Sequence, residues 1–114
     1  MLRLLMLLLL LLAGCSKGPE ADLQYISEAR SLVAEWALVN EQASQGKLTS
    51  TYTDVMREDL REQLQTASKS LTQPNSKYAE QIRAALAQPP DATPQQLRAY
   101  ADALKQEEDS LESA

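Results

Sequence analysis

Apolar residues recur at every third or fourth position along most of the chain, and this spacing constrains the fold more than any other feature. Between residues 22 and 45 the steps alternate between four and three: Tyr25, Ala29, Leu32, Trp36, Val39 and Ala43. Such a seam is typical of helices that pack lengthwise against other helices. Ile26, Val33 and Ala37 widen the apolar face to an arc of about 160°. A face this wide predicts that the helix packs against more than one partner helix.

Boundary signals divide the chain into four predicted helices, at about 22–45, 50–71, 76–88 and 94–111. Gly46 is expected to end the first helix in a left-handed cap, and the short link after it returns the next helix antiparallel. Thr93-Pro94-Gln95-Gln96 combines a Thr N-cap, Pro at the first helical position and Gln at the third. No alternating pattern of strand length occurs. We therefore predict an all-α fold, a small antiparallel bundle of three or four helices within residues 23–114.

The apolar lines of the later helices define the expected core. In 50–71 this line is Tyr52, Val55, Met56, Leu60, Leu64, Ala67 and Leu71. The opposite face carries two expected ion pairs, Asp54–Arg57 and Glu58–Arg61. In 76–88 and 94–111 the inward residues are Tyr78, Ile82, Ala85, Leu86, Leu97, Tyr100, Ala101, Leu104 and Leu111. Glu108 falls inside the last of these lines, so we expect that helix to fray near its end.

Charge and missing residue types argue against several functions. Only Arg3, of the 11 lysines and arginines, precedes Ser16, so the rest of the chain carries 10 basic and 16 acidic side chains, a net charge of −6. Such a surface repels nucleic acid and anionic lipid headgroups. The chain has no His and no glycine-rich phosphate loop. We therefore expect no enzymatic activity, no nucleic-acid partner and no metal.

Residues 1–14 belong to a different physical class. Arg3 precedes an apolar block at 4–12, and the small residues Ala13 and Gly14 follow it. As a helix, fourteen residues reach about 21 Å, short of the bilayer's hydrocarbon core of about 30 Å. A basic start, a short apolar block and small residues describe a signal peptide better than a membrane span. An uncleaved short anchor, or an incidental thiol at Cys15 beside an ordinary cleavage site, are the alternatives.

The segment Leu12-Ala13-Gly14-Cys15 closely resembles the lipobox of bacterial lipoproteins. The resemblance implies that residues 1–14 are cleaved, that the Cys15 sulfur receives a diacylglycerol, and that Cys15 becomes an acylated N-terminus. Two or more acyl chains anchor a protein stably, and this covalent lipid is the only cofactor expected. Because Ser16 is not Asp, the likeness to enterobacterial lipoproteins implies the outer membrane, facing the periplasm, rather than the inner membrane. Residues 15–22 would form the lipidated Cys and a polar tether.

Four features of the helical region are candidates for an interaction surface. Trp36, in the seam, is either a core residue or an anchor for a partner helix. Leu38 points away from the seam, and with Leu23 and Ala34 it would form an apolar strip if no helix covers it. Asn40 lies inside the apolar arc, where it is hydrogen-bonded or hydrated, sets register or contacts a ligand. The acidic end, residues 107–109 and 112, is a solvated, frayed tail or a site for a basic partner or divalent cation.

These features predict a lipid-anchored envelope protein that acts as a structural or accessory module by binding another envelope protein. The alternative is a periplasmic binder or inhibitor of a small ligand or a lytic enzyme, with a pocket between its helices. A cavity lined by Trp36, Asn40 and tyrosines would favour the alternative. A solid core with an exposed apolar strip would favour the accessory module.

Overall fold

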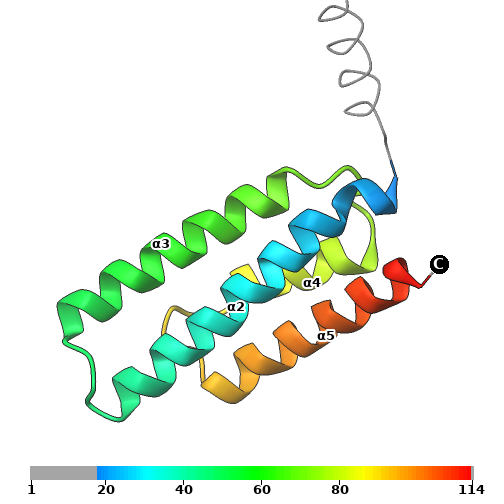
Figure 1. Ribbon diagram of the computed structural model, residues 1–114. Helices are drawn as coiled ribbons and strands as arrows, with labels where there is room; N and C mark the ends of the chain where they lie inside the picture. Colours follow the sequence, from blue (N-terminus) through cyan, green and yellow to red (C-terminus); the bar gives the residue numbers. More distant parts are fainter. Residues whose placement is uncertain (1–17, 114) are drawn as a thin grey trace, which may run out of the picture.

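A computed structural model describes residues 18–113, which fold into an antiparallel bundle (Figure 1). The elements are η1 (Pro19–Asp22), a 3₁₀-helix, followed by the α-helices α2 (Leu23–Ser44), α3 (Ser50–Lys69), α4 (Lys77–Leu86) and α5 (Pro94–Glu112). No strand occurs among these residues. The predicted all-α bundle is confirmed, and every helix end lies within two residues of the predicted one. The predicted signal peptide, lipobox and Cys15 lie outside the described residues.

Helix α2 is the central element of the bundle. It packs against α3 along one side and α5 along the other, while the short α4 lies behind it and contacts α3 and α5 (Figure 1). Its residues Ile26, Ala29, Val33, Trp36 and Ala37 are almost fully buried. The prediction that this helix packs against more than one partner is therefore confirmed, because its wide apolar face is shared between neighbours on two sides.

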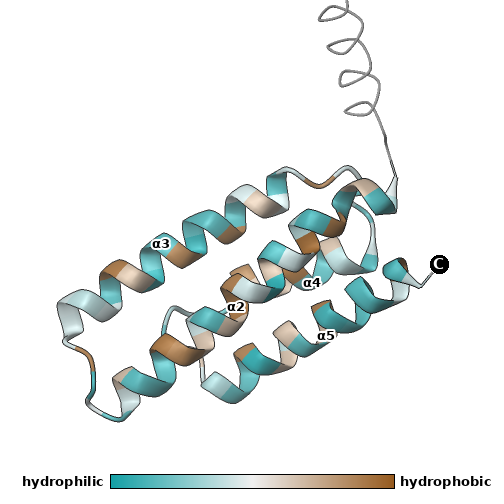
Figure 2. Ribbon diagram, in the orientation of Figure 1, coloured by the Kyte–Doolittle hydropathy of each residue, from teal (hydrophilic) through white to brown (hydrophobic). Residues whose placement is uncertain are grey.

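The core is built from the remaining apolar lines, and Figure 2 shows hydrophobic and hydrophilic residues alternating along the helices. Leu60, Leu64, Ala67, Tyr78, Ile82, Ala85, Leu97, Ala101 and Leu104 are all buried, as predicted. The predicted line of α3 is wrong in its first turns, where Tyr52 and Val55 are 52% and 58% exposed. Thr53 is buried there instead, because it lies seven residues before Leu60 on the same helix face. Its hydroxyl donates to the carbonyl of Thr49 at 2.8 Å, which satisfies the polar group.

Local capping chemistry begins and ends the helices as the sequence indicates. Thr49, Ser76 and Thr93 each accept a backbone N–H in the first turn of α3, α4 and α5. The backbone N–H of Thr93 in turn donates to the side-chain oxygen of Gln96, and the two hydrogen bonds together form a capping box. Gly46 adopts φ 71° after α2, a conformation that favours glycine because it has no Cβ.

The end of α5 differs from the prediction, because the helix continues to Glu112. Glu108 accepts a hydrogen bond from Arg30 Nε of α2 at 2.8 Å, and Glu107 pairs with Lys77 of α4 at 3.5 Å. Asp109 pairs with Lys105 within α5. The expected fraying is therefore wrong, because two of the carboxylates contact cationic side chains on other helices, but Asp109 and Glu112 are exposed, as expected of a solvated end.

Within residues 18–113, no helix combines the length and the apolar character needed to cross a membrane.

Candidate functional site

The candidate contact residues of α2 divide between core and surface. Leu38 is 47% exposed and Ala34 is exposed, whereas Leu23 is partly covered. The apolar strip is thus shorter than expected, centred on Ala34 and Leu38. Trp36 is 1% exposed and belongs to the core, so its indole is removed from the set of candidate contacts.

Asn40 is the centre of a buried polar network that holds the segment 87–93 onto the bundle. Its Nδ2 donates to the carbonyls of Pro90 at 3.0 Å and Ala92 at 2.8 Å. Its Oδ1 accepts from Arg57 Nε at 2.7 Å, and Trp36 Nε1 donates to the same Pro90 carbonyl at 2.8 Å. Asn40 is 4% exposed. Its place in the apolar arc is therefore explained by hydrogen bonds that join α2, α3 and the connection between α4 and α5.

Arg61 turns inward beside this network. Its guanidinium lies 5.5 Å from the centre of the Trp36 ring, and Nη2 lies 3.3 Å from the carbonyl of Leu86 at the end of α4. A cation is favoured at a helix C-terminus and over an indole ring. The Nε of Arg61 is buried without a partner among the described residues. Because Arg61 faces inward, the predicted ion pair between Glu58 and Arg61 is not among those formed by the described residues. The predicted pair between Asp54 and Arg57 does form, with Oδ1 and Nη1 3.9 Å apart.

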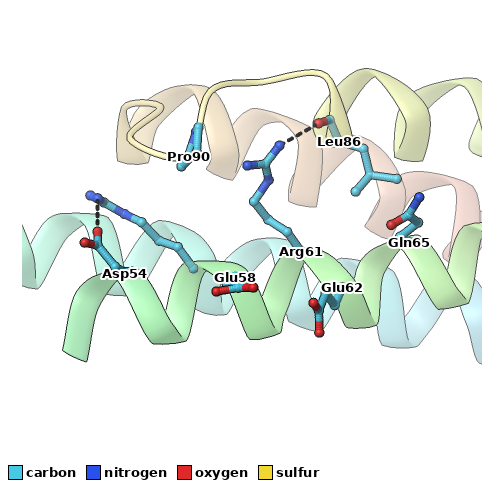
Figure 3. A pocket seen from close by; sticks show the side chains of 8 residues that line it. Asp54, Glu58, Arg61, Glu62, Gln65, Leu86 and Pro90 are labelled. Carbon is cyan, nitrogen blue, oxygen red and sulfur yellow. Dashed lines mark hydrogen bonds and ion pairs between the residues drawn. The ribbon is translucent and has the colours of Figure 1, made fainter. Parts of the chain in front are cut away.

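Two open grooves flank the 87–93 segment. One, of about 490 Å³, lies between α3 and the residues Leu86 and Pro90, and Figure 3 shows Arg61 reaching across it toward Leu86. Its lining combines Arg57 and Arg61 with the acidic residues Asp54, Glu58 and Glu62. The other, of about 370 Å³, is lined by Asn40, Arg57 and residues 91–94. Neither of these two grooves has Trp36 or a tyrosine in its wall, so neither is the cavity lined by Trp36, Asn40 and tyrosines that would favour a small-ligand site.

Asp22 is the centre of a second buried network, which sequence reasoning missed. It is 0% exposed and accepts bonds from Thr72 N at 2.8 Å, Thr72 Oγ1 at 2.9 Å, Gln73 N at 3.2 Å and Tyr78 OH at 2.6 Å. Burial, and then the hydrogen bond to Asp22, raises the pKa of Tyr78 to about 12. The predicted tether at 15–22 is therefore too long, because residues 19–22 are part of the folded domain.

The sequence indicates only one half of this network. Tyr78 is predicted to lie in the core, where its hydroxyl needs a hydrogen-bond partner. Nothing in the sequence identifies Asp22, 56 residues away, as that partner.

No cluster of three or more acidic, cysteine or histidine side chains in the 18–113 region is placed to hold a metal ion. Comparisons with protein-family models, with curated proteins and with solved structures found no match for the chain.

Proposed function

We propose that the chain is a bacterial envelope lipoprotein, anchored by a diacylglycerol on Cys15, whose helical domain serves as an accessory module by binding another envelope protein. The observation that carries the anchor is the sequence Leu12-Ala13-Gly14-Cys15 after a short apolar block. Cys15 is also the only thiol of the chain. The lipid is the only cofactor in this proposal.

The fold supports the proposal through the place where the domain begins. The first element of the bundle, η1, starts at Pro19, four positions after Cys15. Cleavage before Cys15 would therefore leave η1 and all four α-helices in the mature chain. Ser16, in place of Asp, supports sorting to the outer membrane with the domain in the periplasm.

The proposed protein contact is the outward face of α2 around Ala34 and Leu38. These residues lie on the side of α2 that α3, α4 and α5 leave uncovered. An exposed Leu is ordinary by itself, so the contact rests on its position beside a second apolar residue on the central helix.

The anchor is tested with Cys15→Ser in an enteric bacterium supplied with labelled palmitate. The wild-type chain should take up label, lose residues 1–14 and fractionate with the outer membrane. The variant should remain unlabelled and unprocessed or be released. Ser16→Ala is the matched control and should behave as wild type, whereas Ser16→Asp should move the protein to the inner membrane. A mature Cys15→Ser protein in the outer-membrane fraction would contradict the proposal.

The protein contact is tested with photo-crosslinking residues at positions 34 and 38 in living cells. The same residue at exposed position 106 of α5 is the control. A discrete envelope protein should be captured from 34 and 38 and lost when Leu38→Glu accompanies a crosslinker at 34. Equal capture from position 106, or none from any position, would refute this surface.

A binder or inhibitor of a small ligand or lytic enzyme is the second candidate, and the two grooves that share Arg57 are the concave surfaces with which it would make its contact. The purified domain would then slow peptidoglycan hydrolysis by a muramidase. The double variant Glu58→Gln/Glu62→Gln should weaken that inhibition if the first groove makes the contact. An unchanged rate of peptidoglycan hydrolysis in the presence of the wild-type domain would exclude this second function.

A further inference from the structure

The distance between the proposed lipid and the folded domain is short. From Cys15 to Gly18 the chain has three peptide units, which span about 11 Å at most. A tether running to residue 22 would have more than doubled this reach. Which of these two lengths applies depends on whether residues 18–22 stay attached to the bundle.

Asp22 provides that attachment. Its carboxylate is buried and accepts hydrogen bonds from Thr72, Gln73 and Tyr78, so η1 is joined to the α3–α4 connection and to α4. The Thr72 hydroxyl also lies 3.3 Å from the carbonyl of Gly18. Hydrogen bonds to a buried charge are among the stronger ones in proteins, and losing them leaves the charge uncompensated. The chain is therefore held to the bundle from Gly18 onward.

The two ends of the bundle differ in what they present. Figure 1 shows η1, the α3–α4 connection and the C-terminal end of α5 together at one end, and the α2–α3 turn and the start of α5 at the other. Helix α2 has 22 residues, so the two ends are separated by about 33 Å. Asn40 and the second groove lie in the half away from η1, whereas the first groove runs along the middle of α3, from Asp54 to Gln65.

We infer that the α3–α4 end of the bundle is held against the membrane surface and that the α2–α3 turn and the second groove face away from it. This inference rests on the proposed function, because it takes Cys15 as the anchored residue. In this arrangement Ala34 lies about 17 Å above the start of α2, so the partner proposed to contact Ala34 and Leu38 is a protein domain in the aqueous space, not a membrane-embedded helix.

The arrangement is tested on residues 15–114, with the Cys15 thiol coupled chemically to maleimide-headgroup lipid in nanodiscs of phosphatidylcholine and phosphatidylglycerol. Some lipids carry a nitroxide on the headgroup, which broadens nearby amide signals in NMR spectra. Amides at 71–76 should lose several-fold more intensity than those at 45–49. Equal broadening at the two ends, or stronger broadening at 45–49, would overturn the inference.

A variant with a longer tether tests whether the short tether orients the domain, and it leaves the sequence of the folded domain unchanged. Inserting a flexible Gly-Ser segment of about ten residues between Ser16 and Lys17 should reduce the contrast between the two ends. An unchanged contrast would show that the tether does not orient the domain and would also overturn the inference. Because the thiol is coupled chemically, these results do not depend on whether cells lipidate Cys15, which the fractionation of Cys15→Ser tests separately.

Discussion

At the scale of single residues, two polar side chains in the interior tie distant parts of the chain together. Asp22 and Asn40 are each nearly inaccessible to solvent, and each contacts segments about 50 residues away. A buried carboxylate is costly unless hydrogen bonds compensate for the lost water. Asp22 meets this requirement with backbone and hydroxyl donors and has no cationic partner among the described residues.

Asp22→Asn should destabilise the domain by about 2–4 kcal/mol, because the amide turns an N–H₂ group toward donors and leaves them unpaired. The free energy of unfolding, measured by urea denaturation, gives the value. Glu20→Gln is the matched control in the same 3₁₀-helix; Glu20 is exposed, so its effect should stay within about 0.5 kcal/mol. Similar losses in both variants would contradict the role assigned to Asp22.

The raised pKa of Tyr78 predicts a loss of stability in alkali. Its pKa is about 12 in the folded protein against 10.0 for the unperturbed group. The folded state therefore holds this proton more tightly, so the stabilisation is complete below pH 10 and is lost as the pH rises toward 12. The difference in unfolding free energy between wild type and Tyr78→Phe should shrink by about 2–3 kcal/mol over this interval. A difference independent of pH would disprove the assignment.

At the scale of elements, the connection between α4 and α5 is organised by side chains of other helices. Pro90 and Ala92 present carbonyls to Trp36 and Asn40, and Arg61 contacts the carbonyl that ends α4. A segment held in this way does not need regular structure of its own, because its backbone groups find partners elsewhere. The first groove consequently lies between α3 and this connection, and the second lies between α2 and this connection, with Arg57 of α3 beside it.

Asn40→Ala should therefore loosen the 87–93 segment and lower the unfolding free energy by about 2–3 kcal/mol, since Arg57 Nε and the Ala92 carbonyl lose their partner and the Pro90 carbonyl keeps only Trp36. Hydrogen exchange at the amide of Ala92, which donates to Pro89 at 3.0 Å, should become faster. Asn75→Ala, at an exposed position, is the control. Unchanged protection at Ala92 would show that Asn40 does not hold the segment.

At the scale of the whole molecule, the Asp22 network defines where the folded domain starts. A chain of residues 18–114 should be as stable as one of residues 15–114, because the network needs no residue before Gly18. A chain of residues 23–114 should lose about 3 kcal/mol, since Tyr78 and the Thr72 amide are left without their acceptor. Thermal unfolding followed by circular dichroism measures all three. Equal stability of the 23–114 chain would place the domain boundary after Asp22.

Much of the fold could be predicted because its signals are local. The steps of three and four residues in α2, the capping box at Thr93 and the glycine at position 46 each act within a few residues of themselves. The lipobox is equally local, and it remains a prediction. Tyr52 and Val55 mark the limit of such reasoning, because an apolar residue at the edge of a face is buried only if a neighbour covers it.

The sequence by itself thus determined the helices, their order and most of the core, since hydrophobic period and capping depend on neighbouring positions. Only the tertiary structure decided the partners of Asp22, Asn40, Arg61 and Glu108. Each of these side chains meets a residue or ring at least 25 positions away. A sequence can show that a buried polar side chain needs a hydrogen-bond partner. It does not show which residue that partner is, because the packing of the helices brings the partner within hydrogen-bonding distance.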